Sequence, residues 1–574
     1  MKHQPTRQWG WIGFGLLVGG MITCGVAHGA DLTDRAKAFV AEHEKAVRPL
    51  EVTASRAWWN ANTSGKDEDF KTKQAAEEKL VETLADRKAF AEAKSLYDHR
   101  AEITDPTMAR CIEVIYLQRL SLQTDPALSK AIIAKENAVE QAFNVYRAKV
   151  DGKELTASAV TEVLKTSKDS AQRKAVWEAS KGVGKVVEKD LKELVKLRNE
   201  GARQLGFKNF HEATLFTGEQ TTADVMKLFD ELDQLTRGAF DSAKREMDQK
   251  LAANCGVKVE DLRPWHYHDP FFQEAPAVFG ADLDAPYRHA DLLKLSRDFY
   301  AGIGLPIDDV LQRGDYFEKP GKSPHAFCSD IDREGDVRVL ANVVPNEYWM
   351  NTLLHELGHS VYSSKNIPKT VPYTLRTASH TLTTEGLAMM LQRLADSELW
   401  IKQMGITIDN PQAFAQAAAR ARRNELLVFS RWCQVMLRFE KSMYENPDQD
   451  LNALWWDLEE KYQGIKRPEG RNEPDYASKI HIVTSACYYH NYMMGDLFAS
   501  QVHHAIARDV YHGADPRTVT YVGNKAVGQF LQEKIFNAGN LKSWNELTKF
   551  ATGENLNAKA FAQDFKGQGF DMAP

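Results

Sequence analysis

Cysteine is scarce in this chain, and that scarcity argues against two classes of protein. Six cysteines occur among 574 residues, and one of them, Cys24, lies in an N-terminal segment that we expect to be removed. The other five are odd in number and widely spaced: Cys111, Cys255, Cys328, Cys433 and Cys487. This pattern does not form a disulfide framework, and no cysteine lies in a Cys/His arrangement typical of a thiol nucleophile.

The chain also lacks a strong excess of either charge and, after residue 30, any long apolar run. Its formal net charge is −6, with acidic and basic residues interspersed. A nucleic-acid partner or a polybasic membrane surface is therefore not indicated. No segment after residue 30 reaches the length of apolar sequence that crosses a bilayer, so we expect no stable membrane insertion of the mature chain.

The first thirty residues have the pattern of a signal peptide. Lys2 and Arg7 precede an apolar stretch over residues 9–26, and small residues follow at 27–30. We expect cleavage near the end of this segment and a secreted or periplasmic mature protein. An uncleaved anchor is the alternative.

Linkers and internal repeats are missing as well. Without a Gly/Ser-rich or Pro-rich boundary, residues 31–574 are predicted to form a single domain.

Helical periodicity dominates this domain. Leu191, Leu194 and Leu197 recur at helical spacing in a charged stretch, and a further helix is expected over residues 222–253. The clearest strand signal is residues 337–344, which follow residues 323–328 across a polar turn. The fold class is therefore mainly α, with a small β-sheet beside a helix expected over residues 349–359.

The most informative motif is His355-Glu356-Leu357-Gly358-His359. On a helix, residues four apart share a face, so both imidazoles can reach one metal ion. Glu356 is then placed beside a water on that metal. The composition gives roughly 0.03 chance matches to such a motif in a chain of this length, so a metal-dependent hydrolase centre is the better interpretation.

A third ligand is needed to complete the site. Glu385 enters an apolar helical run downstream of His359. A buried carboxylate there is costly unless it is paired or bound to metal; the alternative is a carboxylate at a helix start. A His₂Glu zinc site with a fourth position for water follows.

Several further segments, in the same order along the chain, resemble the angiotensin-converting enzyme family, peptidyl-dipeptidase A, whose zinc site is of the gluzincin type. The resemblance is spread over much of the mature chain. The segments are 57–63 (AWWNANT), 317–320 (FEKP), 325–326 (HA), 454–458 (LWWDL), 461–464 (KYQG) and 479–482 (KIHI).

The resemblance implies a two-lobed helical shell around a deep, lidded cleft that admits short peptides. In this arrangement, residues 31–220 form a helical lid or part of an N-terminal lobe, and residues 221–574 form the remainder with the zinc site. It implies one Zn²⁺ per chain on His355, His359 and Glu385, with Glu356 as general base and then proton donor. It also implies a set of peptide-binding residues. These are His481 at the oxyanion, His325 and Ala326 holding the substrate as an added strand, and Lys479 with a tyrosine and a glutamine at the C-terminal carboxylate. The nearest candidate for the glutamine is Gln273, and the alternative is that Gln273 is a surface amide.

The sequence departs from the family pattern at the tyrosines that follow Lys479. The family has two tyrosines three residues apart. Without a gap, Tyr488 is the carboxylate-binding tyrosine, and Asn491 falls where the oxyanion tyrosine belongs. With a shift of one residue, Tyr489 and Tyr492 take the two roles, and we favour this alignment.

Two other departures concern groups around the site. The aspartate expected four residues after Glu385 is missing, so the groups that orient the zinc ligands are not identified. His490 and Glu459 stand where arginines associated with chloride binding would be expected, so chloride activation is not expected.

These observations predict a zinc peptidase that releases dipeptides from the C-termini of short peptides. An endo-acting oligopeptidase or a single-residue carboxypeptidase on the same scaffold is the first alternative. The second is a non-catalytic peptide-binding protein with a structural zinc ion, against which the presence of Glu356 argues.

Overall fold

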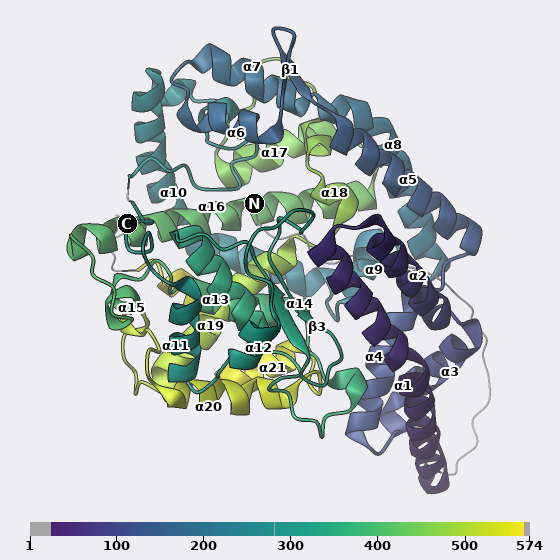
Figure 1. Ribbon diagram of the computed structural model, residues 1–574. Helices are drawn as coiled ribbons and strands as arrows, with labels where there is room; N and C mark the ends of the chain where they lie inside the picture. The colour runs from purple at the N-terminus through teal and green to yellow at the C-terminus, as the bar shows by residue number, and fades with distance from the viewer. Residues whose placement is uncertain (1–24, 281, 567–574) are drawn as a thin grey trace.

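The structure is a computed structural model that describes residues 25–280 and 282–566. Most of the predicted signal peptide, residues 1–24, lies outside the described residues. The fold is mainly α, as the sequence predicted (Figure 1).

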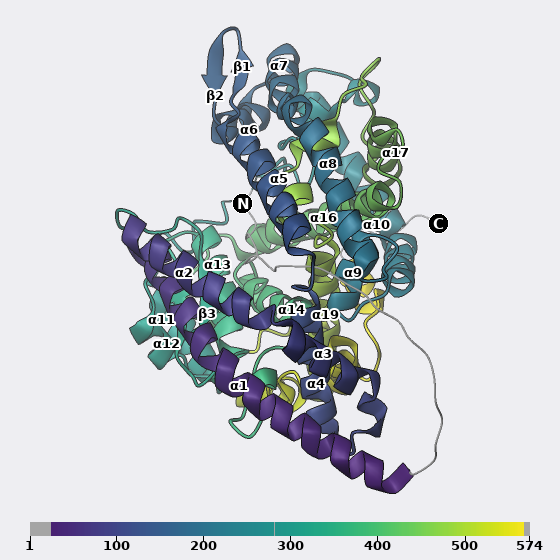
Figure 2. The same cartoon turned by 90° about the vertical axis from the view of Figure 1, so that its right-hand side faces the viewer.

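Figure 2 shows two groups of elements, one above the other. The lower group contains α1 (Gly25–Ser64), α2 (Asp67–Leu84), α3 (Arg87–Asp98), α4 (Pro106–Leu120), α11 (Leu292–Gly302), α12 (Asp308–Arg313), α13 (Glu347–Val361), α14 (Thr381–Gln392), β3 (Phe327–Asp330) and β4 (Val337–Leu340). The upper group contains α5 (Pro126–Val145), β1 (Ala148–Val150), β2 (Lys153–Leu155), α6 (Ala157–Thr166), α7 (Ser170–Lys181), α8 (Val183–Gln204), α10 (Thr222–Cys255) and α17 (Leu451–Gln463). The remaining helices are α9 (Phe210–Thr217), α15 (Glu398–Gln403), α16 (Pro411–Glu445), α18 (His481–Thr484), α19 (His490–Asp509), α20 (Lys525–Lys534), α21 (Trp544–Thr552) and α22 (Lys559–Gln563).

Two long helices connect the groups. Helix α16 contacts α10 and α17 on one side and α19 on the other, and α19 packs along α14. One cluster of buried apolar side chains runs from Leu32 to Phe565 and includes Trp432 and Trp455, both fully buried. The division into one domain of residues 31–574 stays a prediction.

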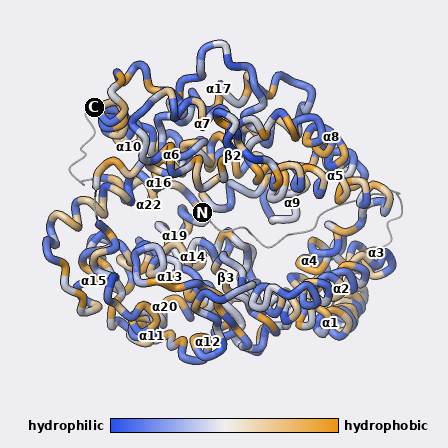
Figure 3. The backbone as a smooth tube through the Cα atoms, turned by 45° about the horizontal axis from the view of Figure 1, so that its top comes forward, coloured by the Kyte–Doolittle hydropathy of each residue, from blue (hydrophilic) through white to orange (hydrophobic). Residues whose placement is uncertain are grey.

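Hydrophobic and hydrophilic segments alternate along the helices of both groups (Figure 3). This alternation is typical of amphipathic helices packed around a shared core. Among the helices that the structure describes, none combines the length and the apolar character that a membrane span requires.

The small sheet predicted before the HExxH helix is present. Strands β3 and β4 are antiparallel, with Phe327 opposite Leu340 and Asp330 opposite Val337. Strand β4 is shorter than the expected 337–344, because the backbone after Leu340 pairs with a different segment. Ala341 N donates to Asp315 O, and Val343 N donates to Tyr316 O.

A second hairpin contradicts the expectation that residues 31–220 are helical throughout. Strands β1 and β2 pair through a turn at Asp151 and Gly152, which have φ angles of 50° and 77°. The hairpin contacts α7. It projects from the upper group in Figure 2.

Helix α1 lies along the outside of the lower group, beside α2 (Figure 2). It contains Pro49, which lacks the N–H that a helix interior uses. Near its end, Trp58 and Trp59 pack on Phe327 of β3, with ring centroids 4.2 and 5.9 Å apart. The second half of α1 therefore contacts the small sheet directly.

Candidate metal and peptide site

Helix α13 presents the HExxH motif as the sequence predicted. Asn346 caps its start, because its side chain accepts from Trp349 N at 2.9 Å. The helix is packed on α14, and the side chains of His355 and Glu356 are 3% and 2% exposed. The first histidine and the glutamate of the motif are thus largely excluded from solvent.

The structure brings His355, His359 and Glu385 together. Their ligand atoms all lie within 4.8 Å of one another. The two Nε2 atoms are 3.0 Å apart, and the Glu385 carboxylate oxygens lie 3.6 Å from His355 Nε2 and 3.9 Å from His359 Nε2. Ligand atoms in a tetrahedral zinc site are about 3.3–3.4 Å apart, because each lies about 2.0–2.1 Å from the metal. The three side chains therefore fit a zinc ion.

The outer nitrogens of both imidazoles have hydrogen-bond partners that the sequence did not reveal. His355 Nδ1 lies 2.5 Å from Gln392 Oε1, and His359 Nδ1 lies 2.7 Å from Thr384 Oγ1. Because Gln392 Oε1 can only accept, His355 Nδ1 carries the proton and Nε2 is left as the ligand atom. Gln392 and Thr384 thus orient the ligands where the expected aspartate is missing.

Substitution of Gln392 by Leu is expected to weaken zinc binding about 10- to 100-fold, because the partner that fixes the His355 ring is lost. Competition with a chromogenic chelator measures this affinity directly. Gln434→Leu is the matched control: Gln434 is a buried glutamine of α16 that donates to Phe229 O at 2.6 Å. Equal zinc affinity of the Gln392 variant and the wild type would contradict the assignment.

The electrostatics of the carboxylates agree with a cation at this position. Burial, with Asp496 nearby, raises the pKa of Glu385 to about 7. Burial and the Glu385 charge raise the pKa of Glu356 well above its usual range, although the Cys328 backbone N–H opposes this by donating to it. Two close carboxylates in a dry site are costly without a positive charge between them.

Strand β3 lies against this helix. Because Cys328 in β3 contacts Glu356, the residues just before it are close to the motif. Ala326 is buried and His325 is exposed. Among the described strands, β3 pairs with β4 alone.

Lys479, Gln273 and Tyr489 come together from three separate segments. Lys479 Nζ donates to Gln273 Oε1 at 2.5 Å, and it lies over the rings of Tyr489 and Trp432 at 5.4 and 5.3 Å. Lys479 is 6% exposed, and its burial lowers its pKa to about 8. The group is a buried cation with an amide and a phenol beside it.

The tyrosines separate into two environments. Tyr489 is beside Lys479, whereas the charge of Glu385 acts on both Tyr488 and Tyr492 and, with burial, raises their pKa values. Asn491 is directed elsewhere, since its Oδ1 accepts from Gln220 Nε2 at 2.7 Å. This arrangement favours the alignment shifted by one residue, with Tyr489 at the carboxylate group and Tyr492 near the metal ligands.

His481 lies at the start of α18, beside Tyr489, with ring centroids 5.2 Å apart. Burial, together with the Lys479 charge, lowers its pKa to about 3, so the imidazole is neutral near pH 7. Its Nδ1 is buried without a hydrogen-bond partner in the part of the chain that the structure describes. A neutral imidazole with one unused nitrogen can still serve as a hydrogen-bond donor to a bound substrate.

The two positions associated with chloride binding hold no fixed positive charge. His490 Nε2 lies 2.7 Å from Gln220 Oε1, and burial lowers its pKa well below the usual range. Glu459 is a buried carboxyl near Lys181, and burial raises its pKa to about 8.

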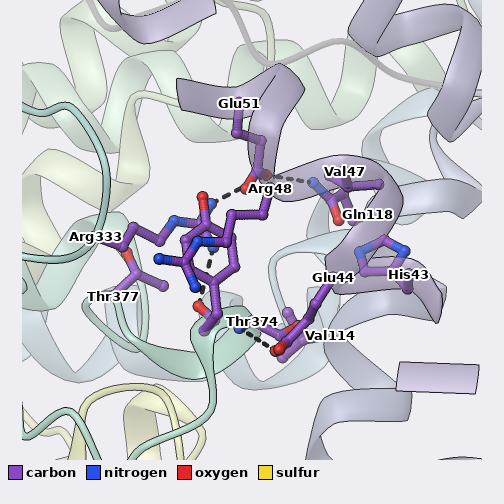
Figure 4. Close-up of a pocket in the computed structure, with 11 residues that line it drawn as sticks. His43, Glu44, Val47, Arg48, Glu51, Val114, Gln118, Arg333, Thr374 and Thr377 are labelled. Carbon is purple, nitrogen blue, oxygen red and sulfur yellow. Dashed lines mark hydrogen bonds and ion pairs between the residues drawn. The ribbon is translucent and has the colours of Figure 1, made fainter. Parts of the chain in front are cut away.

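A cavity of about 200 Å³ lies away from these groups, between α1, α4 and the 3₁₀ helix η4 (Tyr373–Leu375). Figure 4 shows Glu51 bonded to Arg333 and Gln118, and Glu44 bonded to Thr374. Arg333 contacts Glu51 at 3.1 Å, and Arg48 contacts Glu334 at 2.8 Å. These ion pairs connect α1 to the turn between β3 and β4.

Sequence reasoning predicted the grouping of His355, His359 and Glu385, which the structure brings together, but it missed the residues around them. Gln392 could have been found, because it follows Glu385 by seven residues and so lies on the same helical face. Thr384 is adjacent to the ligand in sequence. Trp432, which lies beside Lys479, gave no such signal.

Comparison with known proteins yields one family. The model of the angiotensin-converting enzyme family matches residues 31–250 and 281–568. Residues 251–280, which contain Gln273, fall outside that match.

Individual relatives are distant. The angiotensin-converting enzyme of Oryctolagus cuniculus is 22% identical over 576 residues, covering 94% of this chain and 43% of that protein. That of Mesocricetus auratus is 20% identical over 438 residues, covering 71% and 33%. The angiotensin-converting enzyme-like protein Ace3 of Mus musculus is 21% identical over 440 residues, covering 71% and 58%. The matches thus span from a third to under three fifths of the length of these relatives.

Proposed function

We propose that this chain, which belongs to the angiotensin-converting enzyme family, is a zinc peptidase that releases dipeptides from the C-termini of short peptides. The observation that carries the proposal is the convergence of His355, His359 and Glu385 beside Glu356. A structural zinc site is normally closed by four protein ligands, whereas this group offers three and leaves a carboxylate next to them.

The chemistry divides among the residues as follows. Zinc, when bound to the three ligands, would polarise the peptide carbonyl and lower the pKa of a water towards about 7. Glu356 accepts the proton of the attacking water and then gives it to the leaving amine. Tyr492 donates a hydrogen bond to the developing oxyanion, with His481 as a second donor.

Substrate orientation comes from two other features. The segment at His325 and Ala326, just before β3, takes the peptide as an added strand. Lys479, Gln273 and Tyr489 bind its C-terminal carboxylate. A cation held at a fixed distance beyond the cut favours the release of dipeptides over internal cleavage. The deep cleft expected between the lobes and the secretion expected from the leader belong to the same proposal.

The first experiment is mass spectrometry of a defined decapeptide incubated with the zinc-loaded protein, beside the same peptide with a C-terminal amide. We expect the free acid to lose two residues at a time and the amide to be cleaved much more slowly. Because the carboxylate would bind Lys479, the Lys479→Met variant is expected to lose this preference.

Other product patterns would identify the alternatives. Internal cuts that ignore the amide would indicate an endo-acting oligopeptidase, and loss of single residues would indicate a carboxypeptidase. Stoichiometric zinc and peptide affinity without cleavage would indicate a binding protein.

A further inference from the structure

The loop over residues 269–274, which carries Gln273, has a strained backbone. Phe272 adopts φ +48°, a left-handed conformation that is rare for a bulky residue. Such a conformation is unfavourable and persists only where the surroundings impose it. The loop also lies within residues 251–280, outside the match to the family.

One group that imposes this conformation is the Asp269 side chain. It is 4% exposed, and its oxygens accept from three backbone N–H groups of the same loop. The donors are Phe271 N at 2.8 Å, Gln273 N at 3.1 Å and Glu274 N at 3.2 Å. Asp269 therefore fixes the direction of the backbone on both sides of Phe272.

The second group is Gln463, from the end of α17. It is fully buried, and its Nε2 donates to Phe271 O at 3.1 Å and to Phe272 O at 2.7 Å. Asp269 thus holds the N–H groups of the loop while Gln463 holds its carbonyls. Gln463 belongs to the Lys461–Gly464 segment, and the proposed reaction assigns it no role.

The direction of the loop matters because of what Gln273 and Phe271 contact. Gln273 Oε1 accepts from Lys479 Nζ at 2.5 Å. The Phe271 ring lies between two buried ammonium groups, with Lys479 Nζ 5.3 Å and Lys181 Nζ 3.3 Å from its centroid. Each lysine also experiences the negative charge of Asp269. A shift of the loop would therefore move the amide away from Lys479 and change the surroundings of both cations.

We propose that Asp269 and Gln463 are positioning residues, which clamp the strained 269–274 loop so that Gln273 and Lys479 form a preformed receptor for a free C-terminal carboxylate. The inference deepens the proposed function and rests on it. Preorganisation reduces the cost of ordering side chains when the ligand binds, so the clamp acts on the affinity for the acid and not on the bond-breaking step.

The clearest test is Gln463→Leu, which removes both hydrogen bonds from Gln463 Nε2 to the loop without changing the charge. Its matched control is Gln501→Leu. Gln501 is also a buried glutamine whose Nε2 donates to two loop carbonyls, Glu554 O and Asn555 O, both at 3.2 Å. Steady-state kinetics on the free-acid and amide forms of one peptide are compared for both variants.

For Gln463→Leu we expect KM for the acid to rise about tenfold, with kcat for the acid and kcat/KM for the amide unchanged. Asp269→Ala is expected to behave alike. Asp269→Asn, which keeps one acceptor oxygen, is expected to recover part of the loss. The Gln501 variant should keep the wild-type preference for the acid.

Affinities measured by calorimetry on zinc-loaded Glu356→Gln protein, with and without the clamp substitutions, separate this inference from the proposed reaction. If the clamp variants no longer bind the acid more tightly than the amide, the clamp is supported. This holds even if the wild-type protein cleaves neither peptide, because absence of cleavage would overturn only the proposed function. An unchanged preference in both clamp variants, or an equal loss in the Gln501 control, overturns the clamp.

Discussion

Glu356→Gln protein is expected to retain stoichiometric zinc and to lose about 10⁴-fold in kcat/KM. The carboxylate does not belong to the ligand group of His355, His359 and Glu385, so the metal should stay. The neutral amide cannot take a proton from water or return it to the amine, and so both proton transfers lose their catalyst. Metal analysis by mass spectrometry and kinetics on a fluorogenic peptide measure the two effects on the same sample.

A suitable control is Glu347→Gln. Glu347 lies in the first turn of the same helix, where burial and nearby aspartates raise its pKa to about 7, as expected for a partly buried carboxyl group. This variant should keep its turnover. Zinc retention with near-normal turnover in the Glu356 variant would remove this residue from the mechanism.

Tyr492→Phe is expected to lower kcat about 10²–10³-fold, or ~3–4 kcal/mol, with little change in KM. The physical reason is that its hydroxyl would donate to the oxygen only when that oxygen becomes charged. Tyr489→Phe, in contrast, should raise KM for free-acid peptides, because Tyr489 is beside Lys479. Single-turnover kinetics on both variants separate the chemical step from binding.

The alternative alignment gives the opposite pattern. If Asn491 stood at the oxyanion, Asn491→Ala would lower kcat, and Tyr492→Phe would not. We expect Asn491→Ala to leave kcat nearly unchanged, because its side chain is bonded to Gln220.

The sequence predicted those parts of the site that depend on local spacing. The two histidines and Glu356 lie on one helix, so the i, i+4 spacing of the histidines predicts that their side chains share a face. The hairpin before that helix was predicted for the same reason, because alternating apolar residues flank a polar turn. Both predictions needed only neighbours in the chain.

Long-range contacts were not accessible in this way. Gln273 and Lys479 meet from segments about two hundred residues apart, and Gln463 joins them from a third. The register of the tyrosines depends on where α19 begins, which follows a left-handed residue at Cys487 with φ +57°. The periodicity of apolar residues does not predict where α19 begins.

The hairpin β1–β2 was missed for a different reason. Its strands are short and rich in charged residues, such as Lys149 and Glu154, which have low β-propensity. The Asp151-Gly152 pair was the available signal, because both residues adopt positive φ, as a two-residue type I′ turn requires.

Pro49 has a mechanical consequence for the long helix that borders the small sheet. Without its N–H, the Lys45 carbonyl loses its helical partner, which makes this the point where α1 bends most easily. Before Pro49, Thr33 Oγ1 lies 3.0 Å from Thr104 Oγ1, in the segment before α4. After Pro49, Trp58 packs on Phe327 of β3. A bend at Pro49 would therefore move Trp58 and β3 together, relative to the part of α1 that is bonded to Thr104.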